Sequence, residues 1–384
     1  MSYIIAIGAY LFLLMIYGLV IAHKKVKTAD DMVTGGHRIP FIILVGSLLA
    51  TWCGGGGITG SAGVVYSGGP WVGAITFAAP PIGIILLYFI AGKVRKSNKV
   101  TVPEIMEARY GKAASIISAL CVMLAYVGVL ATQLKAAADI LVLLCSSSGV
   151  TMSHGMALTI CAVIIAIITV GGGLVSVAYS DAVSALIMIG GFFLAIPFLM
   201  SVAASQGAVL PPEKTTLTGG MSGVELLGYF LPSLALMLGD QNMLQRFASA
   251  KNSTEAKKSN IGMFIGEILV IVSIIAVVTQ AARLYPTLDT PSNVIFQVSV
   301  DYLPMAFGAL IMCACMAFIV TTADSYLLVS VQTVVSDLGK TFHPAMKEKQ
   351  EILSPHRLGG AGPGGHWSIA LYIQECLRRA HVRL

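Results

Sequence analysis

Long apolar runs dominate the chain and alternate with short polar segments, many of them basic. An α-helix rises about 1.5 Å per residue, so about 20 apolar residues cross the hydrocarbon core of a bilayer. Nine runs reach or approach this length, which predicts an all-α polytopic membrane protein. The predicted spans cover residues 3–22, 41–64, 71–92, 114–145, 154–173, 176–203, 222–244, 261–282 and 303–336.

The second predicted span contains four consecutive glycines, Gly54 to Gly57. Each glycine costs a helix about 1 kcal/mol relative to alanine, so we expect the helix to unwind there. Unwound backbone at membrane depth is tolerated where it is buried in protein or lines a watery cavity. We therefore interpret this stretch as a candidate binding site. The alternative is close helix packing through small residues, for which two spaced glycines suffice.

A second interruption is predicted in the seventh span, which contains Pro232 and then Gly239, Asp240, Gln241 and Asn242. Two interrupted helices at equivalent positions are typical of secondary transporters built on inverted repeats. Five spans separate the start of the second span from the start of the seventh. The second repeat is therefore expected to be inverted in the membrane.

Three further groups of polar residues lie inside apolar runs. The hydroxyl and carboxylate oxygens of residues 321–325 suit an alkali cation, although Thr and Ser also bond back to the preceding turn of a helix. Lys135 and Asp139 are four residues apart, a spacing that allows structural pairing, and contact with a solute is the alternative. For Glu267 the simplest interpretation is a polar contact on the cytoplasmic side.

Composition excludes most soluble classes. Hydrophobic residues make up 56% of the chain and charged residues 11%, against about 25% charged in soluble domains. This composition does not fit a soluble globular, collagenous, disordered, disulfide-scaffold or nucleic-acid-binding protein. The seven cysteines form no CxxC pair, which favours packing roles over a zinc site. No nucleophile, base and orienting group occur together, so we do not expect an enzyme.

The net charge of +6 is explained by topology. Alternate loops contain 17 lysines and arginines, whereas the intervening loops contain only Lys214 and Arg283. An excess of basic residues marks the cytoplasmic side. The N-terminus is therefore predicted outside and the segment after residue 336 in the cytoplasm. Residues 3–22 lack a preceding basic region and are read as a retained first helix rather than a secretory signal.

Five motifs together resemble the sodium:solute symporter family over about residues 1–350. They are Gly46–Trp52 leading into the glycines, Thr101–Glu104 with Arg109–Gly111, Gly172–Leu174 through Tyr179–Asp181, Asp240-Gln241 with Gln245-Arg246, and Thr321–Ser325 through Asp337. The resemblance implies a leucine-transporter-type inverted-repeat core preceded by one extra N-terminal helix. It also implies sodium-coupled symport of a small organic solute across the cytoplasmic membrane by alternating access.

Site residues follow from the same resemblance. It implies that Na⁺, the coupling ion, is bound by the backbone carbonyls of Ala50, Cys53 and Phe318 and by the hydroxyls of Thr321 and Thr322. Asp181 matches an aspartate near the sodium exit. The implied solute-binding residues are Trp52, Gly56, Gly57, Asp240, Gln241 and Lys135. The sequence looks most like the choline-transporting branch, in which Trp52 would form one wall of a cation–π site helped by Asp240. Amino acids, carboxylates and sugars remain open as solutes.

Two features depart from the family pattern. Ser184 stands three residues after Asp181, where the family usually has glutamine. Core helices 9 and 10 are expected to be missing, because residues 351–384 hold no apolar run of spanning length. The chain is thus divided into an incomplete transmembrane domain, 1–350, and a divergent tail, 351–384. The alternative function is a truncated, non-transporting fragment or a sensor-like membrane module of the same fold.

Overall fold

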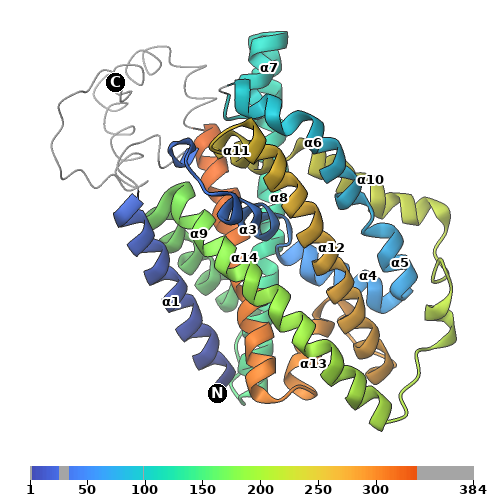
Figure 1. Cartoon of the computed structure of the whole chain (residues 1–384). Helices are drawn as coiled ribbons and strands as arrows, with labels where there is room; N and C mark the ends of the chain where they lie inside the picture. The colour runs from blue at the N-terminus through green and yellow to red at the C-terminus, as the bar shows by residue number, and fades with distance from the viewer. Residues whose placement is uncertain (1, 26–33, 98, 335–384) are drawn as a thin grey trace.

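A computed structural model of the chain, describing residues 2–25, 34–97 and 99–334, shows a bundle of long helices (Figure 1). The first half comprises α1 (Ser2–Lys25), η1 (Gly35–His37), α3 (Phe41–Trp52), η2 (Gly56–Gly60), α4 (Ser61–Gly68), α5 (Pro70–Thr76), α6 (Ala79–Ser97), α7 (Val102–Tyr110) and α8 (Lys112–Ser147). The second half comprises α9 (His154–Ser205), η3 (Pro212–Thr215), α10 (Gly223–Gly239), α11 (Gln241–Ser249), α12 (Ser253–Leu284), η4 (Pro291–Asn293), α13 (Val294–Asp301) and α14 (Met305–Gln332). The described residues form no strand, and one isolated bridge pairs Ile39 with Ala250.

The number of spans is smaller than the nine predicted. Among the described residues, seven helices are long and apolar enough to cross a membrane, and the bent pair Phe41–Trp52 and Gly56–Gly68 makes an eighth. The predicted span 154–173 forms the first part of α9, where His154–Ile167 is a shorter apolar helix. Gly173 has non-helical backbone (φ 61°, ψ −178°) and separates the two parts of α9. The expectations for core helices 9 and 10 and for the tail 351–384 lie outside the described residues.

Both predicted helix breaks are confirmed. Helix α3 ends at Trp52, and the π-helical segment η2 and α4 continue at 60° to it. In the seventh predicted span, Asp240 has extended backbone (φ −70°, ψ 111°) and divides α10 from α11. Pro232 lies inside α10 without ending it. The glycine run and the Gly-Asp step therefore interrupt their helices.

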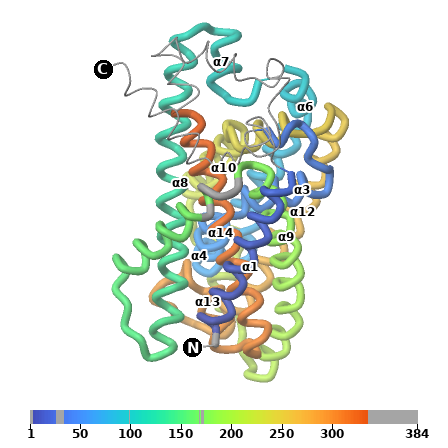
Figure 2. The backbone as a smooth tube through the Cα atoms, turned by 90° about the vertical axis from the view of Figure 1, so that its left-hand side faces the viewer, coloured from blue at the N-terminus to red at the C-terminus, as the bar shows by residue number. Residues whose placement is uncertain are grey.

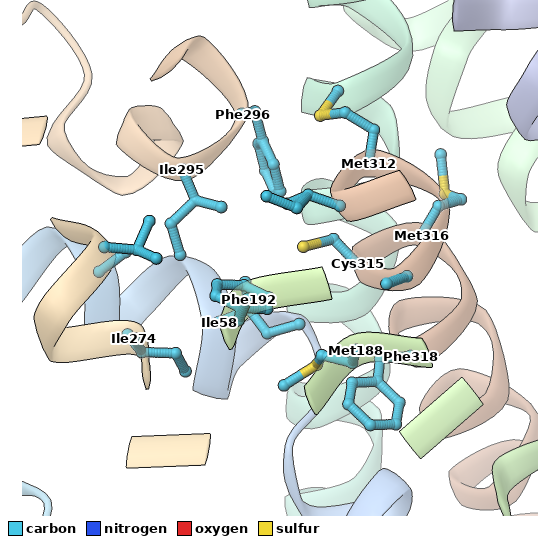
Figure 3. Close-up of a cluster of buried hydrophobic side chains, with 14 of the residues drawn as sticks. Ile58, Met188, Phe192, Ile274, Ile295, Phe296, Met312, Cys315, Met316 and Phe318 are labelled. Atoms are coloured by element: carbon cyan, nitrogen blue, oxygen red, sulfur yellow. The ribbon is translucent and has the colours of Figure 1, made fainter. Parts of the chain in front are cut away.

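Helix α14 is the most buried of the candidate spans, because 72% of the residues in its apolar stretch are buried inside the protein. It packs against α8, α9 and α1. Figure 3 shows the apolar cluster along the N-terminal half of α14, where Phe192 of α9 and Phe296 of α13 meet this helix. Ile58 of η2 is fully buried in the same cluster. The broken helix is thus anchored by one of its own side chains immediately after the glycines.

The basic loops lie at one end of the bundle. The C-terminal end of α1, helix α7 and helix α11 are all at the upper end in Figure 1, opposite the N-terminus, and Figure 2 shows the same arrangement after a quarter turn. Polar contacts join these loops, since Arg95 Nε donates to the carbonyl of Ala250 at 2.6 Å and His37 Nδ1 lies 2.6 Å from the carbonyl of Ala248. The charge asymmetry of the sequence is therefore an asymmetry between the two ends of the fold.

Candidate functional site

The glycine run allows the broken helix to approach its neighbours closely. A Cβ atom on Gly54 would lie 2.6 Å from Thr322 Oγ1, and one on Gly55 would lie 2.8 Å from the Cβ of Ala136. The backbone N–H of Gly55 donates to Gln133 Oε1 of α8 at 2.5 Å. Gln133 is buried, and it binds a backbone group that an unbroken helix would satisfy itself. The sequence analysis missed this residue, although an amide inside the apolar run of α8 was a visible signal.

The residues predicted to bind sodium lie where α14 passes the end of α3. Thr322 Oγ1 donates to the carbonyl of Ala50 at 2.9 Å, and both residues are buried. Thr321 Oγ1 lies 3.5 Å from the carbonyl of Phe318, one turn earlier in α14. Cys53 caps the end of α3. The structure therefore brings the Thr322 hydroxyl of α14 and the Ala50 carbonyl of α3 together beside the first helix break.

Asp181 belongs to a buried polar cluster that joins four helices. Its Oδ2 accepts from Ser47 Oγ at 2.7 Å and lies 3.3 Å from Arg246 Nη2. The fully buried guanidinium of Arg246 also donates to Ser47 at 2.8 Å and to Ser325 at 2.9 Å. Asp324 is buried nearby, and among the described residues neither its Oδ1 nor that of Asp181 has a hydrogen-bond partner. Arg246 pairs with Asp181, and Asp324 is close enough to interact electrostatically with both, so the cluster has a surplus of negative charge when both carboxylates are ionised.

The structure places Asp240 and Gln241 away from the glycine run. Asp240 accepts hydrogen bonds from the hydroxyls of Tyr126 on α8 and Tyr326 on α14. Those tyrosines lie about 10 Å along α8 from Gln133 and about 6 Å along α14 from Thr322, at the rise of a regular helix. Gln241 bonds to the backbone N–H of Val102 and the hydroxyl of Thr333. The polar groups of both predicted solute ligands are therefore satisfied by protein partners.

Lys135 lies on the outer face of α8. Its side chain is 63% exposed and pairs with Asp139 at 2.6 Å. Asp139 also lies 2.8 Å from His154 at the start of α9. These contacts correspond to the structural pairing considered from the sequence and leave Lys135 apart from the other predicted solute ligands.

A further buried carboxylate, that of Glu267 on α12, lies at the first helix break. Its Oε2 accepts from Cys53 Sγ at 3.1 Å, and the indole side chain of Trp52 is within hydrogen-bonding reach. Trp52 is half-buried, and beyond it Gly56 is exposed. The expected cytoplasm-side contact for Glu267 is thus corrected to a contact with the end of α3. The sequence could not indicate it, because Cys53 lies 214 residues away along the chain.

Comparison with known families settles the classification. The model of the sodium:solute symporter family matches residues 32–357, most of the chain. The chain belongs to the sodium:solute symporter family. Its relatives are transporters rather than enzymes, which agrees with the expectation from the sequence.

The similar curated proteins transport different solutes. The chain is 27% identical to the human high affinity choline transporter 1 over 274 residues, covering 66% of this chain and 46% of the transporter. It is 26% identical to the mouse protein of the same name over 360 residues, which cover 85% of this chain and 60% of the mouse protein. It is 25% identical to the sodium/pantothenate symporter of Escherichia coli strain K12 over 365 residues, covering 89% and 74%. The chain thus spans about half the length of the choline transporters that it matches.

Two solved structures share the fold. A substrate-bound, outward-open Na⁺-coupled sialic acid symporter superposes with a TM-score of 0.73 at 17% identity, over 100% of this chain and 81% of that one. Mhp1, a nucleobase-cation-symport-1 family transporter, superposes with a TM-score of 0.60 at 14% identity. The match covers 91% of this chain and 78% of Mhp1. The fold is therefore the leucine-transporter type predicted from the sequence.

Proposed function

We propose that this protein is a sodium-coupled symporter that moves a small organic solute across the cytoplasmic membrane by alternating access. The observation that carries the proposal is the contact between the Thr322 hydroxyl and the Ala50 carbonyl at the broken helix. Na⁺ is the coupling ion. Each sodium ion that enters across 100 mV supplies about 2.3 kcal/mol, which corresponds to about fifty-fold accumulation of solute.

The proposed sodium ligands are the carbonyls of Ala50, Cys53 and Phe318 and the hydroxyls of Thr321 and Thr322. Hydroxyl and carbonyl oxygens are hard ligands suited to an alkali cation, and a helix end supplies carbonyls without intrahelical partners. The hydrogen bond from Thr322 to Ala50 holds two of these oxygens together across the helix interface. A bound sodium ion would replace that hydrogen bond, because the Thr322 hydroxyl can turn its proton away and bind the ion through its oxygen. The ion would then link α3 to α14.

Asp181 is proposed to act on the sodium exit path. It lies beside Thr321 and accepts a hydrogen bond from Ser47. The surplus negative charge of Asp181 and Asp324 over Arg246 lowers the free energy of a cation leaving the site. This role is electrostatic and needs no movement of Asp181 itself.

The proposed solute site is formed by Trp52, Gly56 and Gly57, with Gln133 holding the broken backbone in place. Asp240, Gln241 and Lys135 were also predicted to contact the solute. Their protein partners and positions support structural roles instead. We therefore propose a smaller solute site than the sequence alone suggested, centred on the first helix break.

The proposed orientation places the N-terminus outside and the segment after residue 336 in the cytoplasm. The argument is the gathering of basic loops at one end of the bundle, because such loops are retained on the cytoplasmic side.

The sodium site can be tested by sodium-dependent thermal stabilisation of the purified full chain. Thr321→Ala and Thr322→Ala each remove one ligand, so the half-saturating sodium concentration should rise about tenfold or more, as for the loss of a hydrogen bond to a charge. Thr322→Ser should restore the wild-type value. Thr279→Ala is the matched control, because Thr279 bonds back within α12 to Ile275. An unchanged sodium requirement in both alanine variants would remove these residues from the site.

Uptake into proteoliposomes separates the proposal from its alternative. A symporter should accumulate solute only with an inward sodium gradient. Sodium binding without uptake of any solute would favour a non-transporting fragment or sensor-like module.

A further inference from the structure

Helix α12 approaches the broken helix closely. A Cβ atom on Gly262 would lie 2.5 Å from Val45 Cγ2, and one on Gly266 would lie 2.9 Å from Leu49 Cδ2. Two glycines four residues apart let the two backbones come together, as in other membrane helix pairs. Glu267 follows Gly266 directly, and its carboxylate accepts a hydrogen bond from Cys53, the residue that caps α3.

A negative charge on Glu267 would be poorly compensated by the protein. The residue is only 3% exposed, and among the described residues it forms no ion pair with Lys, Arg or His. Its neighbours are a thiol, which is a weak hydrogen-bond donor, and the indole of Trp52. Arg246, the fully buried cation of this region, is bound to Asp181 on another helix. An ionised carboxylate in these surroundings favours a cation brought in by a ligand.

The surroundings of Glu267 favour an organic ammonium group over a second sodium ion. Sodium requires several hard oxygen ligands, whereas Glu267 is flanked by a soft sulfur and an aromatic ring. An ammonium group gains from a carboxylate and from the face of a tryptophan together. Trp52 is half-buried and Gly56 is exposed, so the indole and the adjacent backbone can be reached by a small solute.

We propose that Glu267 and Trp52 form a subsite for the ammonium group of the transported solute, so that the solute class is a small organic cation. This inference rests on the proposed symport function and names its substrate class. Glu267 takes the charge-pairing role that the sequence suggested for Asp240, whose carboxylate is already bonded to Tyr126 and Tyr326. A neutral or anionic solute of the same size gains nothing from this carboxylate.

The test compares choline with its neutral isostere 3,3-dimethyl-1-butanol, in which carbon replaces the charged nitrogen. Binding to the purified full chain is measured by calorimetry in saturating sodium. Choline should bind at least about tenfold more tightly than the isostere, because only choline pairs with the carboxylate. Glu267→Gln should abolish this difference, and Glu267→Asp should keep a part of it. Pantothenate, an anion, should bind more weakly than choline to the wild-type chain.

Glu255→Gln is the matched control, since it removes a carboxylate from the exposed start of the same helix, where Glu255 lies 3.9 Å from Lys258. It should leave the preference for choline unchanged. Equal affinities for choline and the isostere in the wild-type chain, including no binding of either, would overturn the proposal even if Glu267→Gln failed to fold. Loss of sodium affinity in Glu267→Gln with no change in the choline preference would also overturn it, by assigning the carboxylate to sodium.

Sodium-dependent thermal stabilisation without solute separates this inference from the proposed function. If sodium stabilises the chain and choline is not preferred, the ammonium subsite fails while the sodium site stands. If sodium has no effect in the wild-type chain, the symport proposal itself fails.

Discussion

Arg246 illustrates how one buried side chain can hold several helices together. Its guanidinium donates to Ser47 of α3 and Ser325 of α14 and pairs with Asp181 of α9. Breaking a buried ion pair is costly because the remaining charge has lost its partner. Arg246 is therefore expected to contribute to stability through the carboxylates that it compensates.

Replacing Arg246 by methionine should lower the free energy of unfolding by about 3–5 kcal/mol, because Asp181 is left charged and unpaired. The change is measured as a fall in the thermal unfolding midpoint of the purified chain. The double variant Arg246→Met with Asp181→Asn should recover part of the loss. Arg283→Met is the control, since Arg283 is half-buried and binds the carbonyl of Ala208 rather than a carboxylate. A loss in Arg246→Met no larger than in this control would show that the pair is unimportant.

At the residue scale, the sequence identified groups whose chemistry is concentrated in one segment. The hydroxyls of Thr321 and Thr322 were found this way, and Asp181 through the family motif. Gln133 and Glu267 were not assigned to the helix break, because their partners Gly55 and Cys53 lie 78 and 214 residues away. A polar residue inside an apolar run is visible in the sequence, but the group that it contacts depends on how the helices pack.

At the element scale, the breaks were predictable and their surroundings were not. Consecutive glycines weaken a helix locally, so the break after Trp52 follows from the sequence itself. The second break at Asp240 was also expected, but its side chain was assigned to the solute. The rotation of a broken helix against the adjacent helices decides which neighbour its polar groups contact. In this fold Asp240 meets two tyrosines.

The glycine run offers a test of close approach. Gly54→Ala would place a Cβ 2.6 Å from Thr322 Oγ1 and 2.8 Å from Gln133 Oε1. Thr322 would have to move away from Ala50, so the half-saturating sodium concentration should rise about tenfold and stability should fall by about 1–3 kcal/mol. Gly60→Ala is the control, because nothing lies within 4 Å of its added Cβ. Equal effects of the two substitutions on sodium binding would argue against a role for the close approach.

At the scale of the whole molecule, the distribution of charge was more predictable than the number of spans. Basic loops were assigned to one side from the sequence, and they lie at one end of the bundle. Nine spans were predicted, whereas the described residues hold seven, or eight with the bent pair. Apolar length alone does not show where a helix bends or where, as at Gly173, two parts meet through non-helical backbone.

Orientation can be tested with single cysteines added to exposed loop positions at the two ends. Thr216→Cys, in the loop before α10, should react with a membrane-impermeant thiol reagent in intact cells. Thr254→Cys, at the start of α12, should react only after the cells are permeabilised, because it belongs to the basic end. The unmodified chain controls for its native cysteines. The reverse pattern of labelling would place the N-terminus in the cytoplasm.

The excess of carboxylates over guanidinium in the cluster of Asp181, Asp324 and Arg246 has an electrical consequence. With both aspartates ionised, this cluster holds a net negative charge within the membrane, and bound sodium neutralises the cluster. A membrane potential that is negative inside then pushes the empty site outward and exerts little force on the sodium-loaded one. We expect voltage to accelerate the return of the empty carrier, seen as transient currents in sodium solution without solute that vanish in Asp181→Asn with Asp324→Asn.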